Sequence, residues 1–268
     1  MHRPLAAPAL ALAFLLAACD SDPVAWRDPA AAGTIADAVL SLDATGAPSL
    51  ARAASAPAYP LPAEACAGSL RLAHARGGEW HAAWWQPRAD GSAALMSARS
   101  DDGGATWRAP VVADGRDAGT DGCVRPAPSI AADSVSGYVH IVYYQRPPEG
   151  AGVWYTHSMD GGDSFHSTVG LVYGDEASRA SVASDGMILV AAYETPHSRP
   201  RRIGVALSTD GGHTFRRPLR ASEGDIAAGD PRVAVHGRDF AVSWEERLAQ
   251  RHDSAVVRSV VRAGRVVP

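Results

Sequence analysis

The octapeptide SDDGGATW at residues 100–107 recurs as SMDGGDSF at residues 158–165 and as STDGGHTF at residues 208–215. All three copies follow the pattern Ser-x-Asp-Gly-Gly-x-Thr/Ser-aromatic, and they start 58 and 50 residues apart. A repeat of roughly 50 residues is typical of proteins in which each unit buries its apolar face against the next. This octapeptide is therefore the feature that decides the fold class.

A second repeated element precedes each octapeptide. It consists of a glycine, a run of residues that favour β-strands and, seven residues after the glycine, an aromatic residue followed by Gln or Glu. The interval from this glycine to the octapeptide serine is 22, 21 and 22 residues. Counting 22 residues from Gly237 reaches Ser259, where Val261 replaces the aspartate, so the chain has four units and the fourth octapeptide is degenerate. The four elements are Gly78 with Trp85-Gln86, Gly137 with Tyr144-Gln145, Gly186 with Tyr193-Glu194, and Gly237 with Trp244-Glu245.

Each unit divides into four short β-strands separated by turn signals. In the first unit the strands are expected at residues 70–75, 79–85, 93–99 and after Trp107, with glycine-containing turns between them. Runs such as residues 139–144 and 187–193 are apolar on both faces, which suits sheets that pack face to face. Four-stranded units in tandem predict an all-β fold, specifically a β-propeller with four recognisable blades.

The octapeptide resembles the Asp-box, or BNR repeat, of the sialidase-like β-propeller superfamily, and the resemblance extends over residues 66–268. It implies that each box lies on the turn between the third and fourth strands, away from the ligand site. The carboxylate of an Asp can accept hydrogen bonds from its own turn, glycine permits positive φ, and an aromatic side chain fills apolar space between strands or blades. We therefore expect structural roles for Ser100, Asp102, Gly104, Trp107, Ser158, Asp160, Gly162, Phe165, Ser208, Asp210, Gly212 and Phe215.

The composition excludes several classes of function. The chain has 268 residues and a formal net charge of −4. It therefore lacks the excess of basic residues that would indicate a nucleic-acid partner. It contains no lysine, which excludes Schiff-base chemistry, a P-loop lysine and a Ser–Lys dyad. The ten histidines show no zinc-binding spacing, and we expect neither a metal site nor a cofactor. One alternative is that the octapeptide aspartates bind calcium. Another is that Asp114, Asp117 and Asp121 bind it, but we interpret the loop that contains them as a solvated turn.

Residues 1–18 have the features of a signal peptide, because His2 and Arg3 precede an apolar run too short to span a bilayer as a helix. The run ends in LAAC at residues 16–19, which resembles the lipobox of bacterial lipoproteins. The resemblance implies that Cys19 becomes the lipidated first residue of the mature chain. We expect an exported protein, anchored to the lipid bilayer through Cys19 and facing the periplasm or the cell exterior. The alternative is an ordinary secretory signal that contains a cysteine.

Residues 19–65 are rich in alanine and proline, and we interpret them as a linker between the lipidated Cys19 and a propeller domain at residues 66–268. Ile35, Val39 and Leu42 have the spacing of one helix face, which predicts a short helix at residues 34–43. The alternative is a strand that runs around the domain and completes its last sheet. A ring of four blades, a ring of five completed by residues 20–65, and an incomplete ring that assembles with a partner all remain open.

Two cysteines remain when Cys19 is assigned to the lipid anchor. Cys66 and Cys123 lie 12 and 14 residues before the glycines of the first two units, so both fall at the start of a first strand in neighbouring blades. Because an exported protein meets an oxidising compartment, we expect a Cys66–Cys123 disulfide, worth about 4 kcal/mol for a loop of this length. The alternative is two buried free thiols.

The starts of the first strands and the ends of the second strands share one face of such a propeller. Arginines that meet there suit a carboxylate ligand, because a guanidinium is always charged and binds carboxylates in a bidentate manner. Sialidases hold a sugar carboxylate with three arginines and use a Tyr–Glu pair as nucleophile. The arginines of this chain do not occupy equivalent repeat positions, and inter-blade salt bridges are the simpler interpretation. The candidates are Arg125, Arg179 and Arg232 for ligand binding and Glu194, Glu245 and Tyr144 for catalysis.

Blade number argues against catalysis. Catalytic sialidases have six blades, whereas residues 66–268 supply four units. We therefore expect an envelope lipoprotein whose propeller binds a glycan or another anionic ligand without turnover. The alternatives are a sialidase-type glycoside hydrolase and a scaffold lipoprotein that docks another envelope protein.

Overall fold

The computed structural model describes residues 22–33, 38–52, 55–248 and 256–267. The predicted signal peptide and Cys19 lie outside these residues. Within them the fold is all-β, with two short 3-10 helices, η1 (Ala67–Ser69) and η2 (Arg76–Gly78). No helix in this part of the chain is long and apolar enough to cross a membrane.

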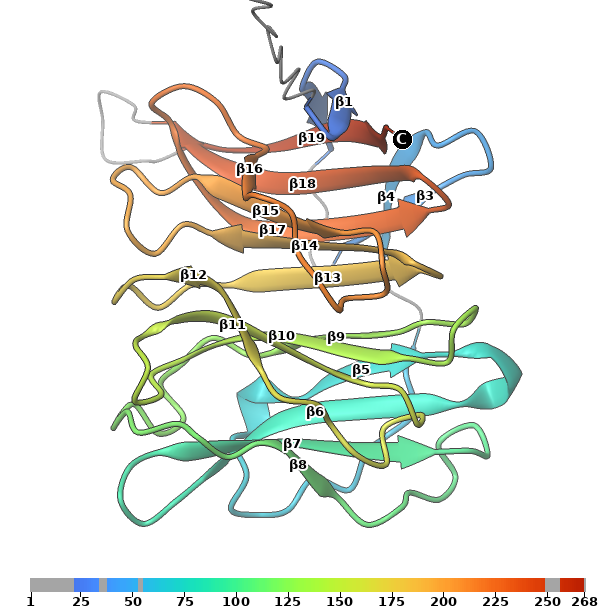
Figure 1. Cartoon of the computed structure of the whole chain (residues 1–268), viewed down its shortest axis with the longest axis vertical. Helices are drawn as coiled ribbons and strands as arrows, with labels where there is room; N and C mark the ends of the chain where they lie inside the picture. Colours follow the sequence, from blue (N-terminus) through green and yellow to red (C-terminus); the bar gives the residue numbers. More distant parts are fainter. Residues whose placement is uncertain (1–21, 34–37, 53–54, 249–255, 268) are drawn as a thin grey trace, which may run out of the picture.

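Units one to three each form a four-stranded antiparallel sheet in which the strands follow one another in chain order. The first strand of each sheet contacts the first strand of the next, so the sheets succeed one another along the molecule (Figure 1). Sheet 1 contains β5 (Arg71–His74), β6 (Trp80–Pro87), β7 (Ala93–Ser100) and β8 (Val111–Asp114); sheet 2 contains β9 (Ser129–Ala132), β10 (Val139–Gln145), β11 (Gly152–Ser158) and β12 (Val169–Tyr173); sheet 3 contains β13 (Ala180–Asp185), β14 (Ile188–Glu194), β15 (Ile203–Ser208) and β16 (Leu219–Arg220).

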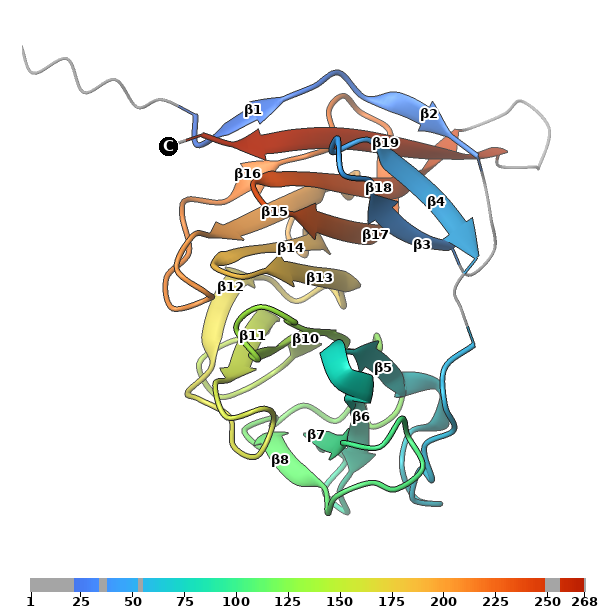
Figure 2. The ribbon, with the colours of Figure 1, turned by 90° about the vertical axis from the view of Figure 1, so that its right-hand side faces the viewer.

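The fourth sheet takes its outermost strands from the beginning of the described chain. β17 (Ala227–His236), β18 (Asp239–Leu248) and β19 (Val256–Val266) come from the fourth unit. β1 (Val24–Trp26) and β2 (Ala30–Ala32) both pair with β19, with Val24 opposite Val266 and Ala31 opposite Val260 (Figure 2). This is the alternative that the sequence left open, a strand that completes the last sheet. It also explains the degenerate fourth octapeptide, because no turn to a fourth strand is needed there.

A two-stranded hairpin follows. β3 (Ala38–Leu42) pairs with β4 (Pro48–Arg52), so the helix predicted at residues 34–43 is wrong for residues 38–42. The spacing of Ile35, Val39 and Leu42 suggested one face of a helix. In the structure Leu40, on one face of β3, packs against Ala234 and Ala241 of the fourth sheet. With four strands between residues 24 and 52, this segment belongs to the fold and is not an irregular linker.

The core lies between successive sheets. Trp85 of sheet 1 packs with Tyr143 and Trp154 of sheet 2, and Tyr144 of sheet 2 packs with Leu189 of sheet 3. A third cluster joins sheets 3 and 4 around Leu207 and Trp244. Strands β10 and β11 are buried along their whole length, as expected for sheets covered on both faces.

Each octapeptide closes its turn with the same hydrogen bonds. In the first copy the Ser100 hydroxyl donates to Asp102 Oδ1 over 2.9 Å and accepts the Gly104 N–H over 2.9 Å. The Asp102 carboxylate accepts the N–H and the hydroxyl of Thr106 over 2.8 and 2.6 Å. The corresponding bonds in the other two copies measure 2.5 to 2.9 Å. The serine and the aspartate thus satisfy backbone groups of a tight turn, as predicted.

The second glycine of each octapeptide lies against the unit that precedes it. A Cβ on Gly212 would meet the Tyr155 hydroxyl of sheet 2 at 1.8 Å, and one on Gly162 would meet His81 of sheet 1 at 3.3 Å. A Cβ on Gly104 would meet Pro57 at 2.4 Å, in the segment that precedes sheet 1. All three glycines also have φ near +90°. The positive φ favours glycine at all three positions, and the close approach also excludes a Cβ at positions 104 and 212.

The aromatic residues of the octapeptides also contact the unit that precedes them. Phe215 packs edge-on against Tyr155 of the preceding sheet, with ring centroids 4.9 Å apart. Trp107 packs edge-on against Tyr59 at 4.8 Å, so the residues before sheet 1 occupy the place of a preceding sheet. Phe165 packs on the cluster between sheets 1 and 2. The aromatic side chains of the octapeptides therefore fill apolar space between units, as predicted.

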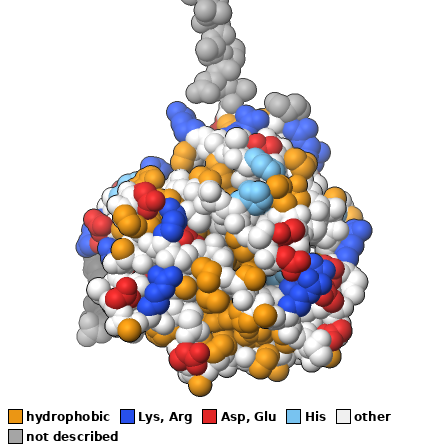
Figure 3. Space-filling model, turned by 60° about the horizontal axis from the view of Figure 1, so that its bottom comes forward, with side chains coloured by type: hydrophobic (Ala, Val, Ile, Leu, Met, Phe, Trp, Pro, Cys, Tyr) orange, Lys and Arg blue, Asp and Glu red, His pale blue; other side chains and the backbone are white. Residues whose placement is uncertain are grey.

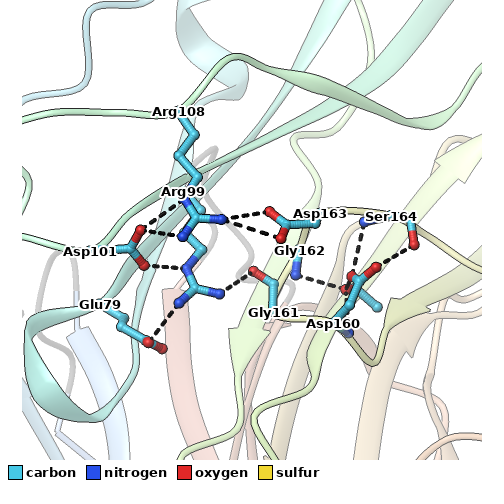
Figure 4. Close-up of polar contacts among 10 residues, drawn as sticks. Glu79, Arg99, Asp101, Arg108, Asp160, Gly161, Gly162, Asp163 and Ser164 are labelled. Carbon is cyan, nitrogen blue, oxygen red and sulfur yellow. Dashed lines mark hydrogen bonds and ion pairs between the residues drawn. The ribbon is translucent and has the colours of Figure 1, made fainter.

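Ion pairs reinforce the contact between the first two octapeptide turns (Figure 4). Arg99 and Arg108 of the sheet 1 turn both pair with Asp101. Arg108 also donates to Asp163 over 2.9 Å, and Arg99 donates to the Gly161 carbonyl over 3.2 Å. These partly exposed ion pairs contribute modestly to stability and connect the octapeptide turns of sheets 1 and 2.

The predicted disulfide is present. Cys66 and Cys123 are bonded, with their Cα atoms 5.3 Å apart, and the bond joins η1 to the loop before β9. It therefore ties the start of sheet 1 to the start of sheet 2, as the repeat register predicted.

Buried histidines line the octapeptide end of sheets 1 and 2. His140 Nδ1 lies 2.8 Å from the Tyr155 hydroxyl, and the His157 ring stacks on His166 with centroids 4.8 Å apart. Burial is the main cause that lowers the pKa of His140 to about 3 and the pKa values of His81 and His157 to about 4. These rings are therefore neutral in the folded protein at pH 7.

We predict that the free energy of unfolding decreases as pH falls from about 6.5 to about 4. The unfolded chain takes up protons at these histidines near pH 6.5, whereas the folded chain resists protonation until about pH 4. His157→Phe should keep the ring and reduce this slope by up to about 1.4 kcal/mol per pH unit. Urea denaturation between pH 4 and 7 measures the slope. The exposed control His197→Phe should leave it unchanged, and equal slopes for both variants would contradict the prediction.

We further predict an acid-sensitive contribution from the octapeptide aspartates. Burial opposes the charge of Asp210, but hydrogen bonds from Thr214 and Ser208 bring its pKa down to about 2. This stabilisation is complete above about pH 4 and is lost as pH falls to about 2. Asp210→Asn should cost roughly 1 kcal/mol at pH 7, after allowance for solvent screening, and little at pH 2. The exposed control Asp28→Asn should have no effect on thermal unfolding at either pH.

Candidate functional site

A cavity of about 760 Å³ lies where the first strands of the sheets meet, and we call it the axial cavity. Its wall includes the starts of β5, β9 and β13, the middle of β17 and Ala38 of β3. Adjacent first strands are held together by side chains that accept a neighbouring N–H. Ser129 accepts from Val182 over 3.0 Å, and Ser181 accepts from Val233 over 3.2 Å. The fold thus brings residues from all four sheets to one cavity.

Three arginines from three sheets line the axial cavity: Arg71, Arg179 and Arg232. Arg71 donates to the Leu70 carbonyl over 2.7 Å. Arg232 is half-buried, and its side chain has no hydrogen-bond or ion-pair partner among the described residues. An unpaired guanidinium in a cavity is a recognition group for a carboxylate or a phosphate. Arg179 and Arg232 are two of the three arginines that the sequence analysis names as ligand-binding candidates, and both line this cavity.

The single carboxylate of the axial cavity, among the described residues, is Asp230. It pairs with Arg179 over 2.6 Å. Its backbone has φ +51°, uncommon for a residue other than glycine, and lies in a β-bulge between Gly229 and Arg232. The bulge turns Asp230 towards Arg179, and the Asp230 N–H is held by Glu194 Oε1 at 3.1 Å. Arg179 is therefore partly neutralised, whereas Arg232 is not.

A second cavity of about 400 Å³ adjoins the first, because Arg179 and Asp230 line both. We call it the side cavity. Glu245 and Arg247 of β18 line it, and neither side chain has a polar partner among the described residues. Arg201 also lines it. The two neighbouring cavities together present a free carboxylate, Glu245, and the free guanidinium groups of Arg232 and Arg247.

Glu194, a candidate for catalysis, uses its carboxylate for contacts with neighbouring residues of the side cavity. Its side chain is 6% exposed, and Oε2 pairs with Arg201 at 2.8 Å. The carboxylate also accepts the N–H of Arg179 over 3.2 Å and the N–H of Asp230 over 3.1 Å. Glu194 therefore positions the backbone of two cavity residues instead of presenting a free carboxylate.

Two other candidates lie elsewhere. The side chain of Arg125 is buried, pairs with Asp117 at 2.9 Å and lies over the Trp85 ring. Tyr144 is buried too, and its hydroxyl donates to the Asp175 carbonyl over 2.7 Å. Neither side chain lines the two cavities. Tyr144 has the core position that was the simpler interpretation of its residue type. Arg125 forms an ion pair within the loop between β8 and β9, so it is not the expected bridge between strands of two blades.

Sequence reasoning missed Arg71 and Arg201. Arg71 stands opposite Ala83, two residues before Trp85, just as Ser129 stands opposite Val142, two residues before Tyr144. Aligning the first strands through their cross-strand partners would therefore have placed Arg71 on the axial wall. Arg201 carries no such signal, because it lies in a loop outside the repeat pattern.

The loop with Asp114, Asp117 and Asp121 is not a solvated turn. Asp114 and Asp117 are 4% and 5% exposed. Asp114 accepts hydrogen bonds from Tyr143 and Gln145, and Asp117 accepts the Ala93 N–H. In the described parts of the chain, no group of three or more His, Cys, Asp or Glu side chains is arranged to hold a metal ion.

Comparisons with known proteins describe the fold. No protein-family model matches the sequence, and no curated protein matches it. A protein of unknown function from Dyadobacter fermentans is structurally similar, with a TM-score of 0.50 and 15% identity over 73% of this chain and 52% of that chain. The Hadza microbial sialidase Hz136 gives a TM-score of 0.47 at 15% identity, over 71% of this chain and 43% of that chain. The catalytic domain of a Coprinopsis cinerea GH62 α-L-arabinofuranosidase gives 0.44 at 12% identity, over 72% and 63%. This chain thus spans less than two thirds of each of these proteins.

We predict that Glu194→Gln and Glu245→Gln differ sharply in their effect on stability. Gln at position 194 leaves Arg201 without its closest carboxylate and directs an amide group at backbone N–H donors. The expected loss is about 2–3 kcal/mol in the free energy of unfolding, measured by urea denaturation. Glu245→Gln should change it by less than about 0.5 kcal/mol, because that carboxylate has no partner in the described structure. A stable Glu194→Gln protein would contradict the positioning role.

Proposed function

We propose that this protein binds an anionic ligand, such as an acidic glycan, in the axial cavity and does not turn it over. The observation that carries the proposal is the convergence of Arg71, Arg179 and Arg232 on a cavity with the single carboxylate Asp230 in the described residues. A cavity of this size accommodates one or two sugar rings. Guanidinium groups on rigid strands are suited to a carboxylate, because they keep their charge at every physiological pH.

The side chains around the cavities favour binding over hydrolysis. A sialidase-type mechanism requires a tyrosine next to a carboxylate. No tyrosine lines either cavity within the described structure, and Glu194 is occupied by Arg201 and by two backbone N–H groups. Glu245 is the free carboxylate, and we assign it to hydrogen bonding with ligand hydroxyl groups in the side cavity.

We propose further that the four sheets and the β3–β4 hairpin form one β-propeller ring. Two sets of contacts support closure. The hairpin packs on the inner strands of the fourth sheet through Leu40. The chain then continues to Pro57 and Tyr59, which lie against the octapeptide of sheet 1. In this arrangement the hairpin and residues 56–65 stand between sheets 4 and 1, where a fifth blade would be.

For location we propose an envelope lipoprotein anchored through Cys19. The support is the lipobox-like LAAC sequence together with a disulfide, which persists in oxidising compartments. A scaffold that docks another envelope protein through the cavity face is less well supported. A docking face is expected to be apolar, whereas the two cavities are lined by charged side chains.

We predict that N-acetylneuraminic acid or glucuronic acid binds and that neutral galactose does not. Arg232→Met should weaken binding by about 10- to 100-fold, the usual cost of losing a charged hydrogen bond. Isothermal titration calorimetry measures the affinities, and the control is Arg76→Met, an exposed arginine of η2 outside the cavities. Equal affinity for acidic and neutral sugars would overturn the proposal. Turnover of a fluorogenic sialoside, abolished by Glu245→Gln, would replace it with the hydrolase.

A further inference from the structure

A third depression, of about 820 Å³, lies on the outer side of the molecule, and we call it the rim groove. Its lining residues come from three sheets: β12 of sheet 2, β14 to β16 of sheet 3, and β1 with β19 of sheet 4. Figure 2 shows where these strands lie in the fold. It shares no residue with the axial or side cavity. The ligand site proposed above therefore does not account for it.

The groove carries unpaired positive charge. Arg217 and Arg220 line it, both are exposed, and neither side chain has a polar partner among the described residues. Glu223, one of the two carboxylates of the groove in the described structure, pairs with Arg262 at 2.9 Å. The other, Asp22, accepts the Val24 N–H over 3.1 Å and keeps its charge, so Arg217 and Arg220 leave the groove with a net positive charge. Two guanidinium groups thus remain free to bind an external anion.

An aromatic side chain stands beside these charges. Trp26 of β1 lines the groove, half-buried, with the Arg262 guanidinium 4.8 Å from its ring centre. Tryptophan is enriched where proteins meet the headgroup region of a bilayer, because its ring is apolar and its N–H is polar. Arg262 is itself held by the Ala221 carbonyl, so the ring and its cation are fixed in place.

The position of the groove relative to the N-terminus identifies its occupant. Asp22, the first described residue, lines the groove and lies three residues after Cys19. Three trans peptide units span at most about 11 Å between Cα atoms. Val24 is paired with Val266, so the anchor position lies within five residues of the fourth sheet along the chain. A lipid on Cys19 would hold the rim groove at the membrane surface.

We propose that the rim groove binds the phosphates of anionic phospholipids and seats the protein directly on the bilayer. The inference rests on the anchor included in the proposed function, but the groove chemistry can be tested without it. Each arginine near an anionic surface strengthens binding by about fivefold. The opposite end of the molecule, formed by sheet 1, shows hydrophobic side chains between scattered charges (Figure 3) and would face away from the membrane.

The test uses the unlipidated chain from residue 20 onward, which contains every described residue. Sedimentation with phosphatidylglycerol–phosphatidylcholine vesicles should show binding that weakens with salt, and phosphatidylcholine vesicles should show none. Arg217→Glu combined with Arg220→Glu should reduce binding at least tenfold. The matched control combines Arg76→Glu with Arg88→Glu, two exposed arginines in the segments before and after β6 that give the same change in net charge. The control should bind as the parent chain does.

Three results would overturn the proposal. The first is equal loss in both double variants, which would indicate non-specific charge attraction. The second is equal binding to both kinds of vesicle. The third is thermal stabilisation by inorganic phosphate that requires Arg217 and Arg220, without vesicle binding, which would identify a soluble phosphate ligand instead. Mass spectrometry of Cys19 in the exported protein tests the anchor separately, so its failure is distinguishable from failure of the groove.

Discussion

The contact between the second glycine of each octapeptide and the unit before it is the constraint on which the other inter-sheet contacts depend. Gly104, Gly162 and Gly212 approach Pro57, His81 and Tyr155 so closely that a methyl group would displace the neighbour. The serine and aspartate hydrogen bonds hold each turn in the conformation that presents this glycine. The same turn therefore determines the distance between neighbouring units three times. The first glycine contacts an irregular segment, and the other two contact sheets 1 and 2.

Fixed spacing at the octapeptide turns brings the first strands together elsewhere in the fold. Ser129 and Ser181 bridge neighbouring first strands, and the axial cavity forms where these strands converge. Glu194 then orients the bulge that carries Asp230, which pairs with Arg179. The candidate site thus consists of free charges beside paired ones that are held by the buried Glu194, an arrangement that favours a rigid binding surface.

The sequence predicted the four units, the structural role of the octapeptides and the Cys66–Cys123 disulfide, because each depends on local pattern or repeat register. Among the site candidates it predicted, Arg179, Arg232, Glu194 and Glu245 line the two cavities. Arg125 and Tyr144 do not, since whether a polar side chain faces the axis or the core depends on strand register and on neighbouring charges. Asp117 shows this, because it is the buried carboxylate that draws Arg125 inward.

By itself the sequence determined the unit and its repetition, because a turn of eight residues needs the same hydrogen bonds and the same glycine wherever it occurs. Only the tertiary structure decided that β1 and β2 complete the last sheet and that Glu194 supports the site instead of lining it as a free acid. The first outcome depends on pairing between residues more than 200 positions apart in the sequence. The second depends on the several groups that contact the Glu194 carboxylate. No local pattern encodes such pairings, since they exist only when the whole chain has packed.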